Sequence, residues 1–224
     1  MKNKIIIIEG AQGVGKTTVT NMLREQIPYS NLYRLSGIED KSFQGLKKVV
    51  NHYFSLFKYL EEDINNDFIS IFDRSFITEM VYSSLGYTSY NFYPYFKTLL
   101  LNDLFKEGFV SVYLLKASKE KFKETLVSHE DKVRHANIEF SAEESFKQQE
   151  TYISICDQLQ NFGLSYETID ISDKTQQDVV NNILLFEDQK ILTHSSPDKD
   201  KVEELYLKNV ELMHQLLEHQ DETV

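Results

Sequence analysis

Short apolar runs alternate with longer stretches of helical spacing along most of this chain. The first run, Ile5–Ile8, is wholly apolar and β-branched, which is typical of a strand buried on both faces. Four further runs predict strands, at residues 31–35, 68–72, 109–115 and 164–169. Apolar residues at helical spacing predict helices at residues 16–26, 43–62, 76–85, 93–106, 119–127, 142–161 and 175–187. Strands that alternate with helices favour an α/β fold, in which helices cover both faces of a parallel sheet.

The pattern changes after residue 187. Residues 193–200 are polar and linker-like, and an amphipathic helix is expected beyond them, with Val202, Leu205 and Leu212 on its apolar face. We therefore expect a main domain at residues 1–187 and a C-terminal extension at residues 188–224. The helix of the extension either packs on its own domain or forms an oligomer contact, for example in a homodimer.

The charge of the chain limits its partners. The 224 residues carry a formal net charge of −11, and residues 187–224 alone hold ten acidic and four basic residues. More than half of the acidic excess therefore lies in the last 38 residues. A strongly acidic chain repels the phosphates of nucleic acid, which argues against a general nucleic-acid binder. A local positive patch can still bind a small anion.

Cysteine use and hydropathy bear on the cellular compartment. Cys156 is the only cysteine, so no intramolecular disulfide can form, as is usual in a reducing cytosol. Its apolar helical setting predicts a buried structural thiol. No run reaches the roughly 20 apolar residues of a membrane span, and the N-terminal MKNKIIIIEG is not a secretory signal. We expect a cytoplasmic protein without a membrane anchor.

A phosphate-binding loop is the strongest chemical signal. Residues 10–17 read GAQGVGKT, which matches GxxxxGK(S/T) between a strand and a helix. Glycines let backbone N–H groups approach phosphate, and the following helix adds its positive N-terminal end. We expect Lys16 on the β- and γ-phosphates and the Thr17 hydroxyl on Mg²⁺, with ATP or GTP as the nucleotide. The residues expected to bind it are Gly10, Ala11, Gln12, Gly13, Val14, Gly15, Lys16, Thr17 and Thr18.

A second signal lies at the end of the predicted strand 68–72, where Asp73, Arg74 and Ser75 follow. Ligands of open parallel sheets bind beyond the carboxyl ends of the strands, so these residues should lie near the phosphate loop. The Asp73 carboxylate could accept a proton from the phosphoryl acceptor or hold the Mg²⁺ shell through water. The Arg74 guanidinium could bind a phosphate in a bidentate manner. The alternative is a surface ion pair, or a helix N-cap at Ser75.

Together, GAQGVGKTT and the strand ending FDRS resemble the thymidylate kinase and deoxynucleoside kinase group of P-loop kinases. The order of elements follows that group over about residues 1–187. The resemblance implies a three-layer fold with a five-stranded parallel sheet and a helical lid, ATP with Mg²⁺ as donor, and a nucleoside or nucleoside monophosphate as acceptor. It also implies catalytic roles for Lys16, Asp73 and Arg74. Thymidylate kinases carry Asp-Arg at this strand end and deoxynucleoside kinases Glu-Arg-Ser, so this chain lies between the two patterns.

The resemblance adds three site candidates. Arg34 could fill the role of the arginine in the Arg-Glu-Pro stretch of thymidylate kinases, although Glu-Pro is absent here. In the lid, expected at about residues 128–141, Arg134 is the first candidate to contact the transferring phosphoryl group. Tyr82 is a candidate acceptor contact, because helices in this region of the family frame the nucleobase. For the lid the alternative is a solvated charged loop, and for Tyr82 it is core packing.

Three functions remain open at this point. The first is a kinase that phosphorylates a nucleoside or nucleoside monophosphate, foremost a deoxynucleotide such as dTMP. The second keeps the chemistry but uses a hydroxyl of a nucleic acid, at its end or on a modified base, and would need a basic track that the net charge argues against. The third is a non-catalytic nucleotide-binding module that signals to a protein partner. The Asp73-Arg74 pair and the expected lid make this third function less favoured.

Overall fold

The computed structural model describes residues 4–35, 42–62, 68–95, 109–127 and 141–191. Its strands are β1 (Lys4–Gly10), β2 (Ser30–Arg34), β3 (Ile69–Asp73), β4 (Val110–Lys116) and β5 (Tyr166–Asp170). Its helices are α1 (Lys16–Gln26), α2 (Phe43–Glu62), α3 (Phe76–Ser84), α6 (Lys119–Val127), α7 (Ala142–Gln160) and α8 (Gln176–Ile191).

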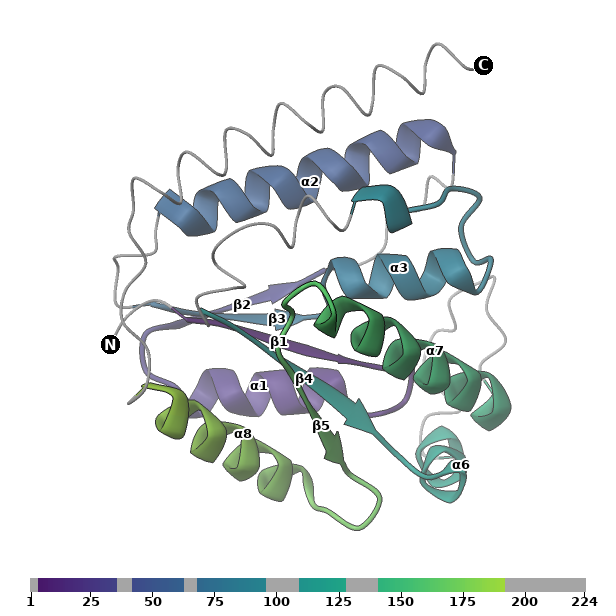
Figure 1. The fold of residues 1–224 in the computed structure, drawn as a ribbon. Coiled ribbons are helices and arrows are strands. Elements are labelled where there is room, and N and C mark those ends of the chain that lie inside the picture. The colour runs from purple at the N-terminus through teal and green to yellow at the C-terminus, as the bar shows by residue number, and fades with distance from the viewer. Residues whose placement is uncertain (1–3, 36–41, 63–67, 96–108, 128–140, 192–224) are drawn as a thin grey trace.

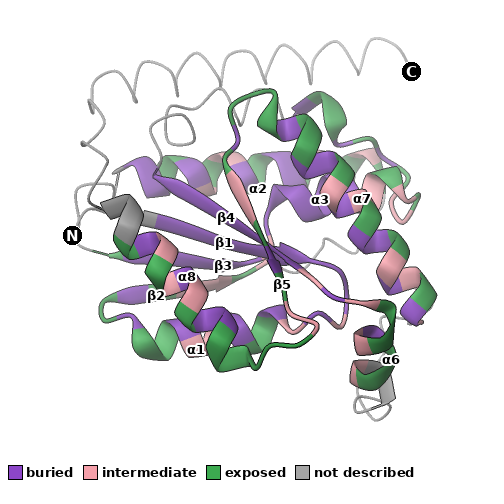
Figure 2. Ribbon diagram, turned by 60° about the horizontal axis from the view of Figure 1, so that its bottom comes forward, coloured by how far each residue is buried: buried purple, intermediate pink, exposed green. Residues whose placement is uncertain are grey.

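The strands form one parallel sheet in the order β2-β3-β1-β4-β5, as Figure 1 shows. In its register, Ile8 of β1 lies opposite Asp73 of β3, and Gly10 lies opposite Leu115 of β4. The three central strands are almost wholly buried, whereas the edge strands β2 and β5 are partly exposed (Figure 2). This burial explains why the central strands are apolar runs rather than alternating ones.

Helices cover the sheet on both faces and make three layers (Figure 1). Alternate residues of β1 serve the two apolar clusters, because successive side chains of a strand point to opposite faces. Ile5 and Ile7 pack with α2, α3 and α7, and Ile6 and Ile8 pack with α1 and α8. Cys156 of α7 is fully buried in the first cluster, as predicted. The expected three-layer α/β fold with a five-stranded parallel sheet is thus confirmed.

Most predicted elements agree with the structure to within two residues. The predicted helix 175–187 begins one residue later and continues to Ile191, beyond the domain boundary expected at residue 187. The predicted helix 93–106 lies mainly outside the described residues, as do nearly all of the lid and most of the C-terminal extension. Within the described part of the chain, no helix is long and apolar enough to cross a membrane.

Candidate active site

The phosphate loop leaves β1 at Gly10, where only glycine fits. Gly10 has a φ of 143°, and a Cβ at this position would lie 2.6 Å from the carbonyl oxygen of Leu115. The loop then leads to Gly15, which has a φ of 87° and precedes the first residue of α1, Lys16. Backbone of this kind is open to glycine and strained for other residues. The glycines of the motif therefore bring the loop against the end of β4 and aim α1 at the loop.

The N-terminus of α1 differs from those of α3 and α7. Ser75 caps α3 by accepting the Ile77 N–H at 3.2 Å, and Ser141 caps α7 by accepting the Glu144 N–H at 3.1 Å. Both helices also carry acidic residues in their first turn. Helix α1 has neither a side-chain cap nor an acidic residue in its first turn. Its positive end is thus left for an external anion, as phosphate binding requires.

Lys16 is buried beside the loop. Its ammonium donates to the carbonyl oxygens of Gly10 at 2.6 Å and of Ala11 at 2.7 Å. Burial lowers the pKa of Lys16, and the positive charge of Arg74 adds to this effect, while Asp73 and another buried carboxylate, Glu9, oppose it. An anion at this position would favour the charged form of the amine.

Thr17 and Asp73 meet although they lie 56 residues apart in sequence. The Thr17 hydroxyl donates to Oδ2 of Asp73 at 2.7 Å. Asp73 is only 5% exposed, and its Oδ1 is buried without a hydrogen-bond partner among the described residues. An uncompensated buried carboxylate oxygen is costly, so it favours a cation or a proton donor at this point.

Oxygen atoms of this kind fit Mg²⁺. The ion is usually bound by one or two protein oxygens together with phosphates and waters, not by a cage of side chains. The residues present therefore fit the magnesium site that the sequence predicts at Thr17 and Asp73.

Arg74 follows β3 and Tyr82 lies on α3, and both contact each other near the phosphate loop. Nη1 of Arg74 donates to the Tyr82 hydroxyl at 3.4 Å, and Nε2 of Gln12 donates to the same oxygen at 3.4 Å. The Tyr82 ring also contacts Tyr87 edge-on, with ring centroids 5.3 Å apart. Three predicted site residues, on the phosphate loop, the strand end and α3, thus come together at one hydroxyl.

Arg34 is not brought to this group. It is exposed, and its guanidinium donates to the Asn21 side chain of α1. The preceding residue, Tyr33, points to the opposite face and stacks on Phe72 at 4.8 Å. The alternation of β2 therefore turns Arg34 toward α1, and its role in acceptor binding stays a prediction. Arg134 lies outside the described residues.

Two buried polar residues at the site carry no recognisable sequence signal. Oε1 of Gln148, on α7, accepts the Gln12 backbone N–H at 3.1 Å, and its Nε2 donates to the Tyr87 hydroxyl at 3.4 Å. This joins α7 to the phosphate loop. The other is Glu9, which is fully buried at the end of β1. Burial raises the pKa of Glu9, against hydrogen bonds from Ser75 and Thr78 and the charge of Lys16. A partner distant in sequence gives no local motif, which is why both were missed.

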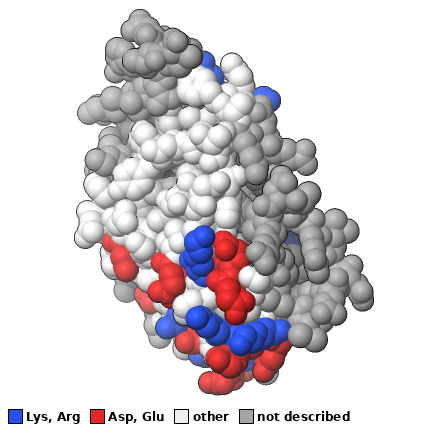
Figure 3. Space-filling model, turned by 90° about the vertical axis from the view of Figure 1, so that its right-hand side faces the viewer, with Lys and Arg blue, Asp and Glu red and all other residues white. Residues whose placement is uncertain are grey.

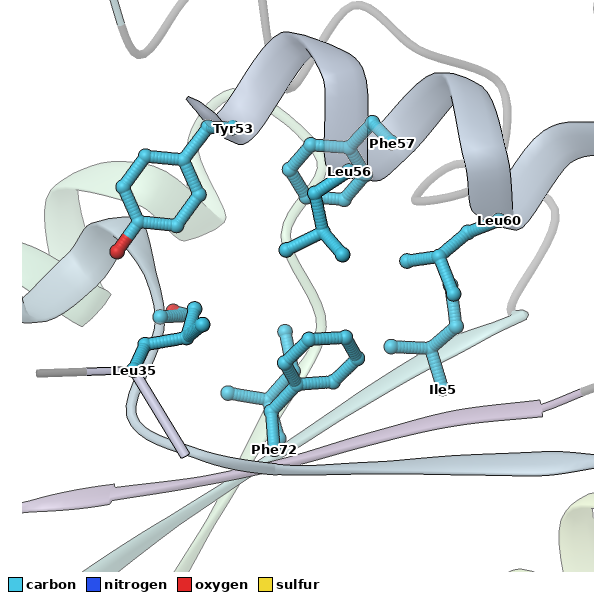
Figure 4. Close-up of a pocket in the computed structure, with 9 residues that line it drawn as sticks. Ile5, Leu35, Tyr53, Leu56, Phe57, Leu60 and Phe72 are labelled. Atoms are coloured by element: carbon cyan, nitrogen blue, oxygen red, sulfur yellow. The ribbon is translucent and has the colours of Figure 1, made fainter. Parts of the chain in front are cut away.

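The surroundings of the site are uneven in polarity. Residues 80–96 contain no charged side chain but five tyrosines. On the side of the molecule in Figure 3, charged side chains gather toward one end and leave an uncharged area beside them. An apolar pocket lies between α2 and the sheet (Figure 4), but its volume of about 10 Å³ suits a single water molecule. We interpret it as a packing gap, since ligand pockets are much larger.

Comparison with known proteins identifies the fold. No protein-family model matches the sequence, and no curated protein sequence matches it. Among solved structures, YorR of Bacillus subtilis in complex with phosphorylated GDP is similar, at 20% identity and a TM-score of 0.61 over 86% of this chain and 100% of that one. Thymidylate kinase of Candida albicans is similar at 14% identity and a TM-score of 0.52, over 88% of this chain and 96% of that one. Deoxyadenosine kinase of M. mycoides with dCMP and dCDP is similar at 16% identity and a TM-score of 0.54, over 83% of this chain and 99% of that one. The chain has the fold of these P-loop proteins.

Proposed function

We propose that this protein is a kinase that transfers a phosphoryl group from ATP to a nucleoside or nucleoside monophosphate, with a deoxynucleotide such as dTMP as the first candidate. The observation that carries the proposal is the contact between the Thr17 hydroxyl and Asp73, at the carboxyl edge of β3 and beside the uncapped N-terminus of α1. This edge is where parallel sheets of this kind bind ligands.

Each residue has a role that its position supports. The backbone N–H groups of residues 10–18 and the N-terminus of α1 hold the phosphates, and Lys16 neutralises the β- and γ-phosphates. Thr17 and Asp73 would hold Mg²⁺, which would offset the charge of the phosphates. The direct Thr17–Asp73 contact favours this role of Asp73 over that of a general base. Arg74 binds the acceptor near its phosphate or 5′ oxygen.

Three observations support a nucleoside or nucleotide as the phosphoryl acceptor. YorR was solved with phosphorylated GDP, and the M. mycoides deoxyadenosine kinase with dCMP and dCDP, so nucleotides are bound by proteins of this fold. Asp73-Arg74 matches the strand end of thymidylate kinases and Arg74-Ser75 that of deoxynucleoside kinases, so a monophosphate such as dTMP and a nucleoside both stay candidates. The hydrogen bonds from Gln12 and Arg74 to the Tyr82 hydroxyl support Tyr82 as a contact of the acceptor.

A kinase screen tests the proposal. The full chain is incubated with labelled ATP or GTP and Mg²⁺ against nucleosides, nucleoside monophosphates and short oligonucleotides, and labelled products are separated and identified. We expect product only with a free nucleoside or monophosphate, and loss of product in Lys16→Ala. Labelled oligonucleotide would instead favour a nucleic-acid acceptor. A folded protein that binds ATP but labels none of these acceptors would contradict the proposed function.

A further inference from the structure

Glu9 is a fully buried carboxylate that none of the roles above uses. It is the second-last residue of β1, between the apolar strand and Gly10 of the phosphate loop. A buried ionisable group is retained only where other groups compensate for its lost hydration. The partners of Glu9 therefore indicate what it does.

Among the described residues, every hydrogen bond to the Glu9 carboxylate comes from α3 or its N-cap. Oε1 accepts the backbone N–H of Ser75 at 2.7 Å and the Ser75 hydroxyl at 2.6 Å. Oε2 accepts the Thr78 hydroxyl at 2.8 Å. Because the single Thr78 proton goes to Glu9, the Tyr152 hydroxyl of α7 donates to Thr78, at 2.8 Å. These hydrogen bonds all point toward Glu9. The ionised carboxylate, whose oxygens only accept hydrogen bonds, is the form that satisfies every donor.

These bonds surround the strained part of the strand end. Arg74 has a φ of 78°, in the left-handed region that residues other than glycine seldom adopt. Its N–H donates to the Ile8 carbonyl at 3.1 Å, and the next N–H, that of Ser75, donates to Glu9. Two consecutive residues of β1 thus hold two consecutive amides of the turn. The side chain of Ser75 is also the N-cap of α3.

We propose that Glu9 is a positioning residue, whose buried carboxylate holds the Arg74–Ser75 turn so that Asp73 and Arg74 face the phosphate loop. The inference rests on the proposed kinase function, because it assigns Glu9 to the same site. Glu9 touches neither nucleotide nor acceptor in this role and acts through Ser75. The alternative is that Glu9 contributes only to the stability of the fold.

The main test uses Glu9→Gln. Glutamine keeps the shape and one acceptor oxygen for Ser75 but places an NH₂ donor against Thr78, so the turn loosens while the chain can still fold. We expect kcat to fall by about tenfold or more, since small shifts of positioned groups have large effects on rate. The KM for ATP should change by less than about twofold, because the phosphate loop is intact.

Glu187→Gln is the matched control. Glu187 is a buried carboxylate of α8 that accepts the Tyr113 hydroxyl at 2.6 Å, on the other face of the sheet. We expect it to lower the melting temperature without changing kcat. In a double-mutant cycle, Glu9→Gln and Ser75→Ala should not add in their effects on kcat. If Glu9→Gln lowers stability but leaves kcat at the Glu187→Gln value, or if the cycle is additive, the positioning role is wrong.

A readout without turnover separates this inference from the proposed function. The ¹⁵N NMR signal of the Arg74 side chain, assigned with Arg74→Lys, should shift in full-length Glu9→Gln and stay in place in Glu187→Gln. If the unaltered protein phosphorylates no acceptor, the kinase proposal fails, and this signal alone decides the role of Glu9. An unchanged Arg74 signal in Glu9→Gln would overturn the inference.

Discussion

At the scale of single residues, the contact between Thr17 and Asp73 brings two separate sequence signals into one site. The motif positions could be predicted because each residue type has a fixed chemical task in a phosphate loop. Arg34 shows where such reasoning stops. Its family role was transferred by sequence position, whereas the direction of its side chain follows from strand alternation, which turns it toward Asn21. Glu9 could not be predicted, because its donors lie 66 and 69 residues away.

The magnesium site leads to a prediction about Thr17. Thr17→Ala removes the hydroxyl and leaves Oδ2 of Asp73 without its donor, so we expect turnover to fall by about 100-fold and the Mg²⁺ requirement to rise. Thr17→Ser keeps the hydroxyl and should stay within several-fold of the unaltered protein. The initial rate is measured against Mg²⁺ concentration for both variants. Identical Mg²⁺ dependence in Thr17→Ala and the unaltered protein would contradict the assigned ligand.

At the scale of helices and strands, apolar patterning predicted the elements well because the central strands are buried on both faces and the helices on one. The start of β5 was placed too early, at residue 164 rather than at Tyr166. Leu164 is buried and apolar, but its N–H donates to the Leu159 carbonyl at 3.2 Å, in the turn that closes α7. Gly163, with a φ of 95°, makes this turn. A residue of such a turn can enter the core as a strand residue does, and periodicity does not separate the two cases.

One side chain of α7 makes two hydrogen bonds to the residue that follows β4. Gln149 accepts the Ala117 N–H at 2.7 Å and donates to the Ala117 carbonyl at 3.0 Å, just beyond β4. Gln149→Ala would leave both buried backbone groups without this partner, so we predict a loss of about 2–3 kcal/mol in the free energy of unfolding. The exposed Gln160→Ala in the same helix should change it by less than about 0.5 kcal/mol.

Urea unfolding of both variants checks this prediction. The slope with urea should stay constant, so that a shift of the midpoint reports stability alone. Equal midpoints for Gln149→Ala and Gln160→Ala would mean that α7 does not depend on the Ala117 contact.

At the scale of the whole molecule, the two apolar clusters and the sheet lie within residues 5–186. The acidic excess of the sequence is concentrated beyond them, since residues 187–224 hold ten acidic and four basic residues. The net charge of −11 therefore says little about the phosphate site, where Lys16 and Arg74 lie beside Asp73. The order of the strands in the sheet was not predicted, because no local pattern states which strands are neighbours.

This division predicts the effect of shortening the chain. A cut at residue 187 would interrupt α8, which continues to Ile191, so the chain should end at Ile191. We expect this chain to keep the phosphorylation rate and to melt within a few degrees of the full protein. Its mass in solution, measured by light scattering, distinguishes an oligomer contact, which halves the mass when lost, from packing on the same domain. Loss of turnover with an unchanged melting temperature would contradict a non-catalytic extension.

The ammonium of Lys16 already has two oxygen partners in its own loop, Gly10 and Ala11. A nucleotide that attracts this ammonium must therefore compete with the loop, and the gain in affinity is a difference between two sets of bonds. Lys16 can then contribute little to the affinity for bound ATP and much to the stabilisation of the transition state, in which the charge on the phosphates is redistributed. Lys16→Met would separate the contribution to ATP binding from the contribution to the transition state. It should abolish turnover while the affinity for ATP changes by less than about tenfold. The loop carbonyls thus set the interaction energy that the phosphates of the nucleotide must exceed to attract the Lys16 ammonium.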